Sequence, residues 1–468
     1  MKQFIPAAFI LLTAILLTSC SEQVKNPVTE TDIITAPEYE GYEFTVLTRD
    51  FTVDDPWRIY EIDTEYSNGE VLNDSIVQRD LAIEERWNIK LSKIVNINPA
   101  SYAYNNIMAE THAFDVMMSS LFDCSRIAQS GMAYDLFDIA YMDMTNPWWD
   151  QSAVRDLSIG GSLYFVTGDF SYRNYNAPWI YVFNKNITDS CSLEDPYGLV
   201  NSGKWTIDKF GEMIQTVSFS IDGAERYGLI TESANTLGMF IGAGNTVVSK
   251  PKDNGDYPVI TLSTKRGVTS VEKILSCLNN AAVININNPE FVRYTDDLWQ
   301  GVVDTFTSDR ALFYSTVMYT VHKLRGMDSD FGILPMPKLD ETQEAHYTWV
   351  SPWITSGLVI PASVPDIERI GRIMEDIAYE SSLTIRPAYY DVTLEGKFTR
   401  DEESATMIDV ILSNRVYDLG MIYDWNGIGS LLSVMAAERE NTFTSRYATI
   451  IKNAEFDLAR VIMDYREF

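Results

Sequence analysis

A regular alternation of strand-like and helix-like segments near the start of the chain is the strongest constraint on its fold. Residues 42–48 and 88–95 are rich in β-branched and apolar residues, and residues 114–118 (FDVMM) form a short apolar run, so all three are predicted strands. Residues 73–87 and 101–110 lie between them and carry apolar residues at helical spacing. Strands that alternate with helices in this way predict a mainly parallel, doubly wound α/β sheet.

The same alternation resumes after residue 200 and indicates a second unit of the same class. A helix is expected to start after Thr206, which would cap it, and strands are expected at 227–231 and 310–315. Apolar residues at helical spacing follow Asp366, and residues 445–466 form a final amphipathic segment. A chain of 468 residues exceeds what one hydrophobic core usually serves, so we expect two domains.

The N-terminal segment has the features of a secretory signal. Lys2 precedes an apolar run over residues 4–17, which is too short to span a bilayer comfortably. The run ends in LTSC, which resembles the lipobox of bacterial lipoproteins. That resemblance implies cleavage before Cys20, a lipid on this cysteine, and a polar tether over residues 21–38. The alternative is an ordinary secretory signal with a coincidental cysteine. We expect a protein anchored by lipid on the extracellular face of the cell membrane.

The charge and the cysteines exclude several classes of protein. The sequence has 36 basic and 66 acidic residues and a formal charge of −30, with no basic cluster. Nucleic acid is therefore not an expected partner, because phosphate neutralisation needs a basic surface. This charge also opposes self-association, so we expect a monomer. Cys124, Cys191 and Cys277 are too few and too widely spaced for a disulfide framework; one pair or three buried thiols are both open.

Residues 162–186 form an unusual stretch that we interpret as a crossing between the two lobes. The runs 163–167 and 179–183 have strand composition, and the connection between them (GDFSYRNYNAP) is rich in tyrosine and asparagine and contains Asp169. A connection that only turns the chain would be shorter and less aromatic. We expect it to line a cleft. A β-ribbon with half-buried tyrosines is the alternative interpretation.

Three motifs together resemble the extracellular solute-binding lipoproteins of ABC importers, in the family 1 or maltose-binding-protein-like group. The stretch LYFVTGDFSYRNYNAPWIYVFNK, which ends in Asn184-Lys185, is similar to that family's first crossover, although Phe183 stands where tyrosine is frequent. GKWTIDKF (203–210) is similar to its helix start, and DFGILPMPK (330–338) resembles its strand and turn. Their order extends the resemblance over nearly the whole chain that follows the signal segment.

The resemblance implies a two-lobed periplasmic-binding-protein fold, in which each lobe has a doubly wound sheet and the chain crosses three times between lobes. Ligands of this family bind between the lobes, which close by a hinge motion. The expected division is a signal peptide at 1–19, a lipidated cysteine and tether at 20–39, a first lobe at 40–168 and 314–352, a second lobe at 175–310 and 356–468, and crossings at 169–174, 311–313 and 353–355.

The resemblance further implies a sugar-binding cleft, because flat aromatic rings cover the apolar faces of a sugar and planar polar groups pair its hydroxyls. The candidate ligand-binding residues follow predicted strands or lie at the crossings, and they are Asp50, Trp57, Ser120, Asp169, Tyr172, Tyr175, Trp353 and Trp425. Core or interlobe packing is the alternative role for each tryptophan and tyrosine. Asp169 is the strongest candidate, because a carboxylate between aromatics at a crossing has few structural roles.

Enzymatic signatures are missing from the sequence. The three histidines form no HExxH pair, and no GxSxG elbow or GxxxxGK phosphate loop is present. We therefore expect no catalytic residue, metal or cofactor, and a receptor that delivers a mono- or oligosaccharide to an ABC permease. A peptide or another polar solute is also open. The runner-up is a glycoside hydrolase, which needs a carboxylate pair. A surface adhesion or structural lipoprotein would not explain two α/β lobes.

Overall fold

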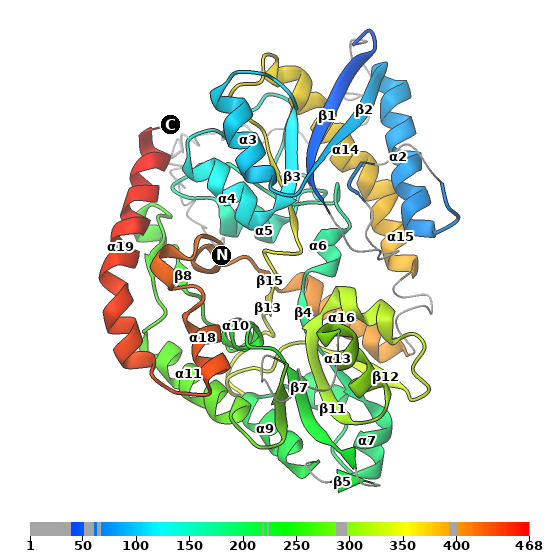
Figure 1. Cartoon of the computed structure of the whole chain (residues 1–468), viewed down its shortest axis with the longest axis vertical. Coiled ribbons are helices and arrows are strands. Elements are labelled where there is room, and N and C mark those ends of the chain that lie inside the picture. Colours follow the sequence, from blue (N-terminus) through cyan, green and yellow to red (C-terminus); the bar gives the residue numbers. More distant parts are fainter. Residues whose placement is uncertain are drawn as a thin grey trace, which may run out of the picture.

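The computed structural model describes residues 39–50, 60–62, 67–217, 220–221, 224–286, 297–392 and 401–467. The signal segment, Cys20, the tether and Trp57 lie outside these residues. The molecule has two lobes, one above the other in Figure 1, and each is built around its own β-sheet. The α/β class expected from the sequence is confirmed.

The sheet of the first lobe has the strand order β14-β3-β1-β2. Strand β1 pairs in parallel with β2 and β3, and β14 pairs antiparallel with β3. Its strands are β1 (Tyr42–Arg49), β2 (Ile89–Asn96), β3 (Val116–Ser120) and β14 (Ser356–Val359). Helices from two separate parts of the chain flank this sheet (Figure 1), namely α2 (Val71–Trp87), α3 (Pro99–Met108), α4 (Leu121–Gln129), α14 (Ile367–Leu383) and α15 (Ile385–Val392).

The sheet of the second lobe has the order β10-β7-β11-β4-β12. Strands β10, β7 and β11 are mutually parallel, and β4 runs antiparallel to both of its neighbours. The strands are β4 (Trp179–Asn184), β7 (Tyr227–Thr231), β10 (Val283–Asn285), β11 (Ala311–Val317) and β12 (Phe331–Leu334). The helices of this lobe are α7 (Lys185–Ser190), α8 (Pro196–Asn201), α9 (Ile207–Thr216), α10 (Asn235–Gly242), α11 (Lys265–Leu278), α13 (Leu298–Thr307) and α16 (Glu402–Ser413).

Shorter elements and the C-terminal helices connect the lobes or extend from them. Around the crossings lie α5 (Gln151–Leu157), α6 (Arg173–Asn176), β13 (Thr348–Trp349) and β15 (Arg415–Val416). Small hairpins are formed by β5 (Ser220–Ile221) with β6 (Ala224–Glu225), and by β8 (Val248–Ser249) with β9 (Val259–Ile260) around η1 (Lys252–Asn254). The remaining elements are η2 (Met318–Leu324), α17 (Leu419–Tyr423), η4 (Trp425–Gly427), α18 (Leu431–Glu438) and α19 (Phe443–Glu467).

Most predicted elements form where the sequence placed them. Strand β7 occupies the predicted residues 227–231, and the predicted final helix becomes α19, which runs along one side of the molecule in Figure 1. Thr206 caps α9 by accepting a hydrogen bond from the N–H of Lys209, as expected. Residues 163–167 do not form a regular strand; Val166 makes an isolated bridge to Leu358 of β14.

The division of the chain between the lobes differs from the sequence-based prediction. Residues 311–313, predicted as a crossing, lie inside β11, whose Phe313 pairs with Phe183 of β4 in the second sheet. Strand β12 also belongs to the second sheet, and β14 belongs to the first. Helices α14 and α15 pack on α2 in the first lobe, and α16 packs on β12 in the second. Composition identifies an element but not what it packs against, and for this reason the prediction placed β12, β14, α14 and α15 in the wrong lobes.

Two clusters of buried side chains hold the lobes together. The larger is continuous from the first sheet, through the crossing residues, to the face of the second sheet that α9 and α10 cover. The smaller lies on the other side of the second sheet and includes Ile180, Tyr314 and Ile333. Among the described residues, no helix combines the length and apolarity needed to cross a bilayer.

Candidate ligand-binding cleft

A cavity of about 780 Å³ lies between the lobes. The first lobe contributes Phe122 at the start of α4, and the segment that returns to that lobe contributes residues 351–354. The second lobe contributes side chains at the carboxyl ends of β7 and β11, including Glu232 and Thr316. The carboxyl ends of parallel strands are where open α/β sheets bind ligands. The size of the cavity suits a small molecule of several rings.

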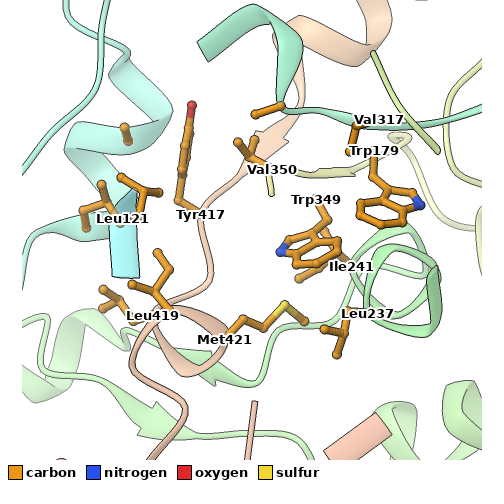
Figure 2. Close-up of a cluster of buried hydrophobic side chains, with 14 of the residues drawn as sticks. Leu121, Trp179, Leu237, Ile241, Val317, Trp349, Val350, Tyr417, Leu419 and Met421 are labelled. Atoms are coloured by element: carbon orange, nitrogen blue, oxygen red, sulfur yellow. The ribbon is translucent and has the colours of Figure 1, made fainter. Parts of the chain in front are cut away.

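A tryptophan pair forms the floor of the cavity. Trp179 of β4 and Trp349 of β13 stack with ring centroids 5.0 Å apart and an interplanar angle of 29°. The Trp179 Nε1 donates a hydrogen bond to Ser315 Oγ over 2.8 Å, which fixes that ring. Figure 2 shows the pair with Leu237 and Met421, which also line the cavity. Both rings are buried and rest against each other, so they form a rigid part of the cavity wall.

Trp353 is an exposed aromatic surface on the side of the first lobe. Its side chain is 64% exposed and lies 6.2 Å from the ring of Phe122. Arg49, at the end of β1, donates to the Trp353 carbonyl oxygen over 2.7 Å, and its guanidinium carbon is 5.4 Å from the Trp353 ring centroid. The ring is therefore held in place by its backbone and by a cation while much of its surface stays open to solvent.

Trp299 is the corresponding exposed aromatic on the second lobe. It lies in the first turn of α13 and is 53% exposed. Asp297 caps this helix by accepting hydrogen bonds from the N–H groups of Trp299 and Gln300, over 3.0 and 3.1 Å. The cap fixes the start of the helix and with it the position of the ring. Trp299 and Trp353 thus expose aromatic surface to the cavity from different lobes.

Glu232 is a carboxylate that lines the cavity at the end of a strand of the second sheet. It follows the last residue of β7, and within the described part of the chain its side chain has no hydrogen-bond or ion-pair partner. Burial raises its pKa to about 7. Asp424 also lines the cavity, but it accepts a hydrogen bond from the N–H of Ser430 over 2.8 Å. Hydroxyl groups are supplied nearby by Thr316 and Thr320, which bond to each other over 2.7 Å.

Of the residues that sequence reasoning proposed, Trp353 lines the cavity. Trp425 is buried and stacks on Tyr423 with centroids 5.0 Å apart, directly after the cavity residue Asp424. Ser120 is buried and caps α4 by accepting from the N–H of Asp123. The N–H of Asp50 donates to the carbonyl of Asn96, and Asp50 is not among the cavity-lining residues.

Asp169, Tyr172 and Tyr175 lie together at the first crossing, away from the cavity lining, and all three are buried. Asp169 accepts a hydrogen bond from the Tyr175 hydroxyl and forms a 3.0 Å ion pair with Arg386 of α15. Burial raises the pKa of Asp169 to about 6, although these two partners lower it. In this structure Asp169 ties the crossing to the first lobe, which is the packing role that the sequence alone left open.

The cavity residues that were missed from the sequence include Trp179, Glu232, Trp299 and Asp424. Glu232 carried a usable signal, because it directly follows a correctly predicted strand at the edge where ligands bind. Trp179 was identified as a strand residue but not as part of the cleft. Trp299 had no comparable signal, because its approach to the cavity depends on how α13 packs.

Metal-ligand groupings and cysteine pairing were both questions raised by the sequence. Among the described residues, no three histidine, cysteine, aspartate or glutamate side chains are grouped to hold a metal ion. Cys124, Cys191 and Cys277 are all free thiols; Cys124 and Cys277 are buried and Cys191 is half-buried. Of the two possibilities that the sequence left open, the structure therefore has the free thiols and not the pair, with Cys191 less buried than the other two.

Solved structures of sugar-binding proteins resemble this chain over almost its whole length. A sugar transporter from Rhizobium etli in an open conformation has a TM-score of 0.57 and 12% identity, and the match covers 92% of this chain and 100% of that one. An ABC substrate-binding protein from Listeria monocytogenes in complex with cycloalternan gives 0.53 and 12%, covering 90% and 99%. The maltose-binding periplasmic protein of the same organism, in complex with maltose, gives 0.51 and 15%, covering 91% and 97%.

Sequence comparison alone does not detect this similarity. No protein-family model matches the chain, and no curated protein matches it. The similarity is therefore one of three-dimensional structure, and its coverage of 90–92% of this chain includes both lobes. The chain has the two-lobed periplasmic-binding-protein fold of the maltose-binding-protein type, as its motifs predicted.

Proposed function

We propose that this protein is a substrate-binding receptor that captures a saccharide between its lobes and delivers it to an ABC permease. The observation that carries the proposal is the interlobe cavity, which has the exposed ring of Trp353 on the first lobe and that of Trp299 on the second. Aromatic rings pack against the C–H faces of sugars, and nearby hydroxyls and carboxylates pair with sugar hydroxyls. Similar folds among the solved structures bind cycloalternan and maltose.

Closure of the lobes would couple binding to transport. A ligand that contacts both lobes stabilises the closed arrangement by its differential affinity for that state. Phe122 and Trp353 would then cover one face of the sugar and Trp299 the other. A permease that recognises the closed arrangement would respond to the loaded receptor. We further propose a monomer, lipid-anchored through Cys20 at the extracellular face of the membrane, that does not transform its ligand.

A thermal unfolding assay tests this proposal. The chain from Ser21 onward is heated with a panel of monosaccharides, oligosaccharides, polyols and peptides. A ligand that binds only the native state raises the unfolding midpoint with concentration. We expect a shift with one saccharide class, and no product of sugar cleavage by chromatography. Shifts with peptides alone, or with no member of the panel, would contradict a saccharide receptor, and turnover of the sugar would favour the hydrolase.

Substitution of Trp299 tests whether the ligand that raises the unfolding midpoint is bound in the interlobe cavity. Trp299→Ala removes an exposed ring from the second lobe and is expected to weaken saccharide binding about tenfold, measured by calorimetric titration. Phe456→Ala is the control, because Phe456 is an aromatic residue of α19 that is 70% exposed and does not line the cavity. Equal affinity of the two variants would place the ligand elsewhere.

A further inference from the structure

Glu232 differs from the other carboxylates of the cavity because its side chain is not used by the fold. Asp297 accepts two backbone N–H groups at the start of α13, and Asp424 accepts the N–H of Ser430. Glu232 has no such partner among the described residues, and burial is the one cause acting on its carboxyl group, whose pKa it raises. A half-buried carboxylate without a partner is costly to the fold. Such a cost is typical of a group whose hydrogen-bond or ion-pair partner is supplied by a bound ligand.

The charges around the cavity favour a cation as that ligand group. The described residues that line it include three carboxylates, Glu232, Asp297 and Asp424, and one lysine, Lys323. Lys323 lies beside the ring of Tyr319, with its Nζ 5.9 Å from the ring centroid, and exerts no charge effect on Glu232. The described residues therefore supply no cation to Glu232, and a cationic ligand group would complement the negative charge of the cavity.

The aromatic side chains that line the cavity also favour a cationic ligand group. Ammonium groups are attracted to the faces of tryptophan and tyrosine rings, most strongly where water is partly excluded. Trp299 and Trp353 expose their rings at the cavity, and Tyr314 lies close enough to Glu232 for its hydroxyl to respond to that charge. A carboxylate surrounded by aromatic rings accepts an ammonium through both a charge-assisted hydrogen bond and ring contacts.

From this geometry we infer that the bound saccharide carries a free amino group and that Glu232 binds this ammonium. The inference rests on the proposed function and narrows its substrate class to amino sugars. A neutral sugar hydroxyl would pair with Glu232 more weakly, since it brings no positive charge. A uronic acid would place a second negative charge in the cavity and be rejected.

Three matched saccharides test the inference. They are three forms of one mono- or disaccharide from the class identified by thermal unfolding. The forms differ at one carbon, which carries a free amine, an N-acetylated amine or a hydroxyl. At neutral pH we expect the free amine to bind about tenfold more tightly than either counterpart, by calorimetric titration. Glu232→Gln keeps the shape of the side chain but not its charge, and should remove this preference while retaining the affinity for the hydroxyl form.

The outcomes separate this inference from the proposed function. Equal affinity for the three saccharides, or a preference that survives in Glu232→Gln, overturns the role of Glu232 and leaves the receptor standing. Binding of a simple ammonium such as choline, with no saccharide bound, overturns both. Asp297→Asn is the control, because it also removes a cavity carboxylate but one already used as a helix cap, and it should leave the amine preference in place.

Discussion

At the scale of single residues, Glu375 is a carboxylate whose hydrogen bonds the fold supplies, and Glu232 is one that the described part of the fold leaves without a partner. Glu375 of α14 accepts hydrogen bonds from the indole N–H groups of Trp148 and Trp149, over 3.0 and 2.9 Å. The Asn146 amide and the backbone N–H of Asp143 complete its partners. The Glu375 carboxylate thereby fixes the rings of Trp148 and Trp149, which precede the first crossing. Glu232 has no equivalent set, so its charge opposes folding when no ligand is present.

The stability of the ligand-free protein should reflect this difference. The pKa of Glu232 is raised from 4.5 to about 7 in the fold, so the folded state retains a proton that the unfolded chain releases in this range. The free energy of unfolding therefore falls as pH rises from 4.5 to about 7. We expect Glu232→Gln to be about 1–3 kcal/mol more stable than the wild type above this range and equal to it below. Urea unfolding at several pH values measures the difference, and a constant offset would contradict it.

At the scale of elements, the hairpin of β8 and β9 makes a contact that joins the lobes. Lys250 donates hydrogen bonds to the carbonyl oxygens of Arg155 in the last turn of α5 and of Ser158, which caps that helix. The ring of Tyr257 packs on Gly160, which has a φ of +60°. A Cβ at this glycine would lie 2.3 Å from the tyrosine ring, so any other residue would displace that ring from its present position.

Alanine substitutions at two adjacent glycines test this contact. Gly160→Ala adds both a positive-φ penalty and a clash with Tyr257, and it should cost about 2–4 kcal/mol of unfolding free energy. Gly161→Ala, at a φ of +96° with no atom within 4 Å of its Cβ, carries the backbone penalty alone, about 1–2 kcal/mol. Denaturant unfolding measures both. The Tyr257→Ala change should bring Gly160→Ala to the cost of its neighbour; equal costs without it would show that the hairpin does not dock here.

The sequence predicted local elements well because their signals are local. The cap at Thr206 and the strand at 227–231 depend on residues next to one another. The assignment of β11 and β14 to lobes depends on pairing with β4 and β3, which lie more than a hundred residues away along the chain. The same distinction between local and long-range signals explains which residues of the cleft could be predicted. Trp353 could be proposed from its place at a crossing, whereas Trp299 reaches the cavity only through the packing of α13.

At the scale of the whole molecule, the fold implies a change of shape on binding. The exposed rings of Trp299 and Trp353 belong to different lobes and would be buried together by a ligand between them. Saturation with the saccharide should lower the radius of gyration in small-angle X-ray scattering and shift tryptophan emission to shorter wavelength. Trp299→Phe should reduce the fluorescence change but keep the change in radius. An unchanged radius at saturation would mean that the ligand binds without closure.

The contact made by Lys250 limits the kind of motion that the lobes can perform. Pulling the lobes straight apart would break its hydrogen bonds to Arg155 and Ser158 together, whereas a rotation about an axis through this contact would preserve them. The contact therefore favours a rotation of the lobes over their separation. The size of the captured molecule would then be expressed as one angle between the lobes, and a permease could distinguish a full cleft from a partly filled one by that angle alone.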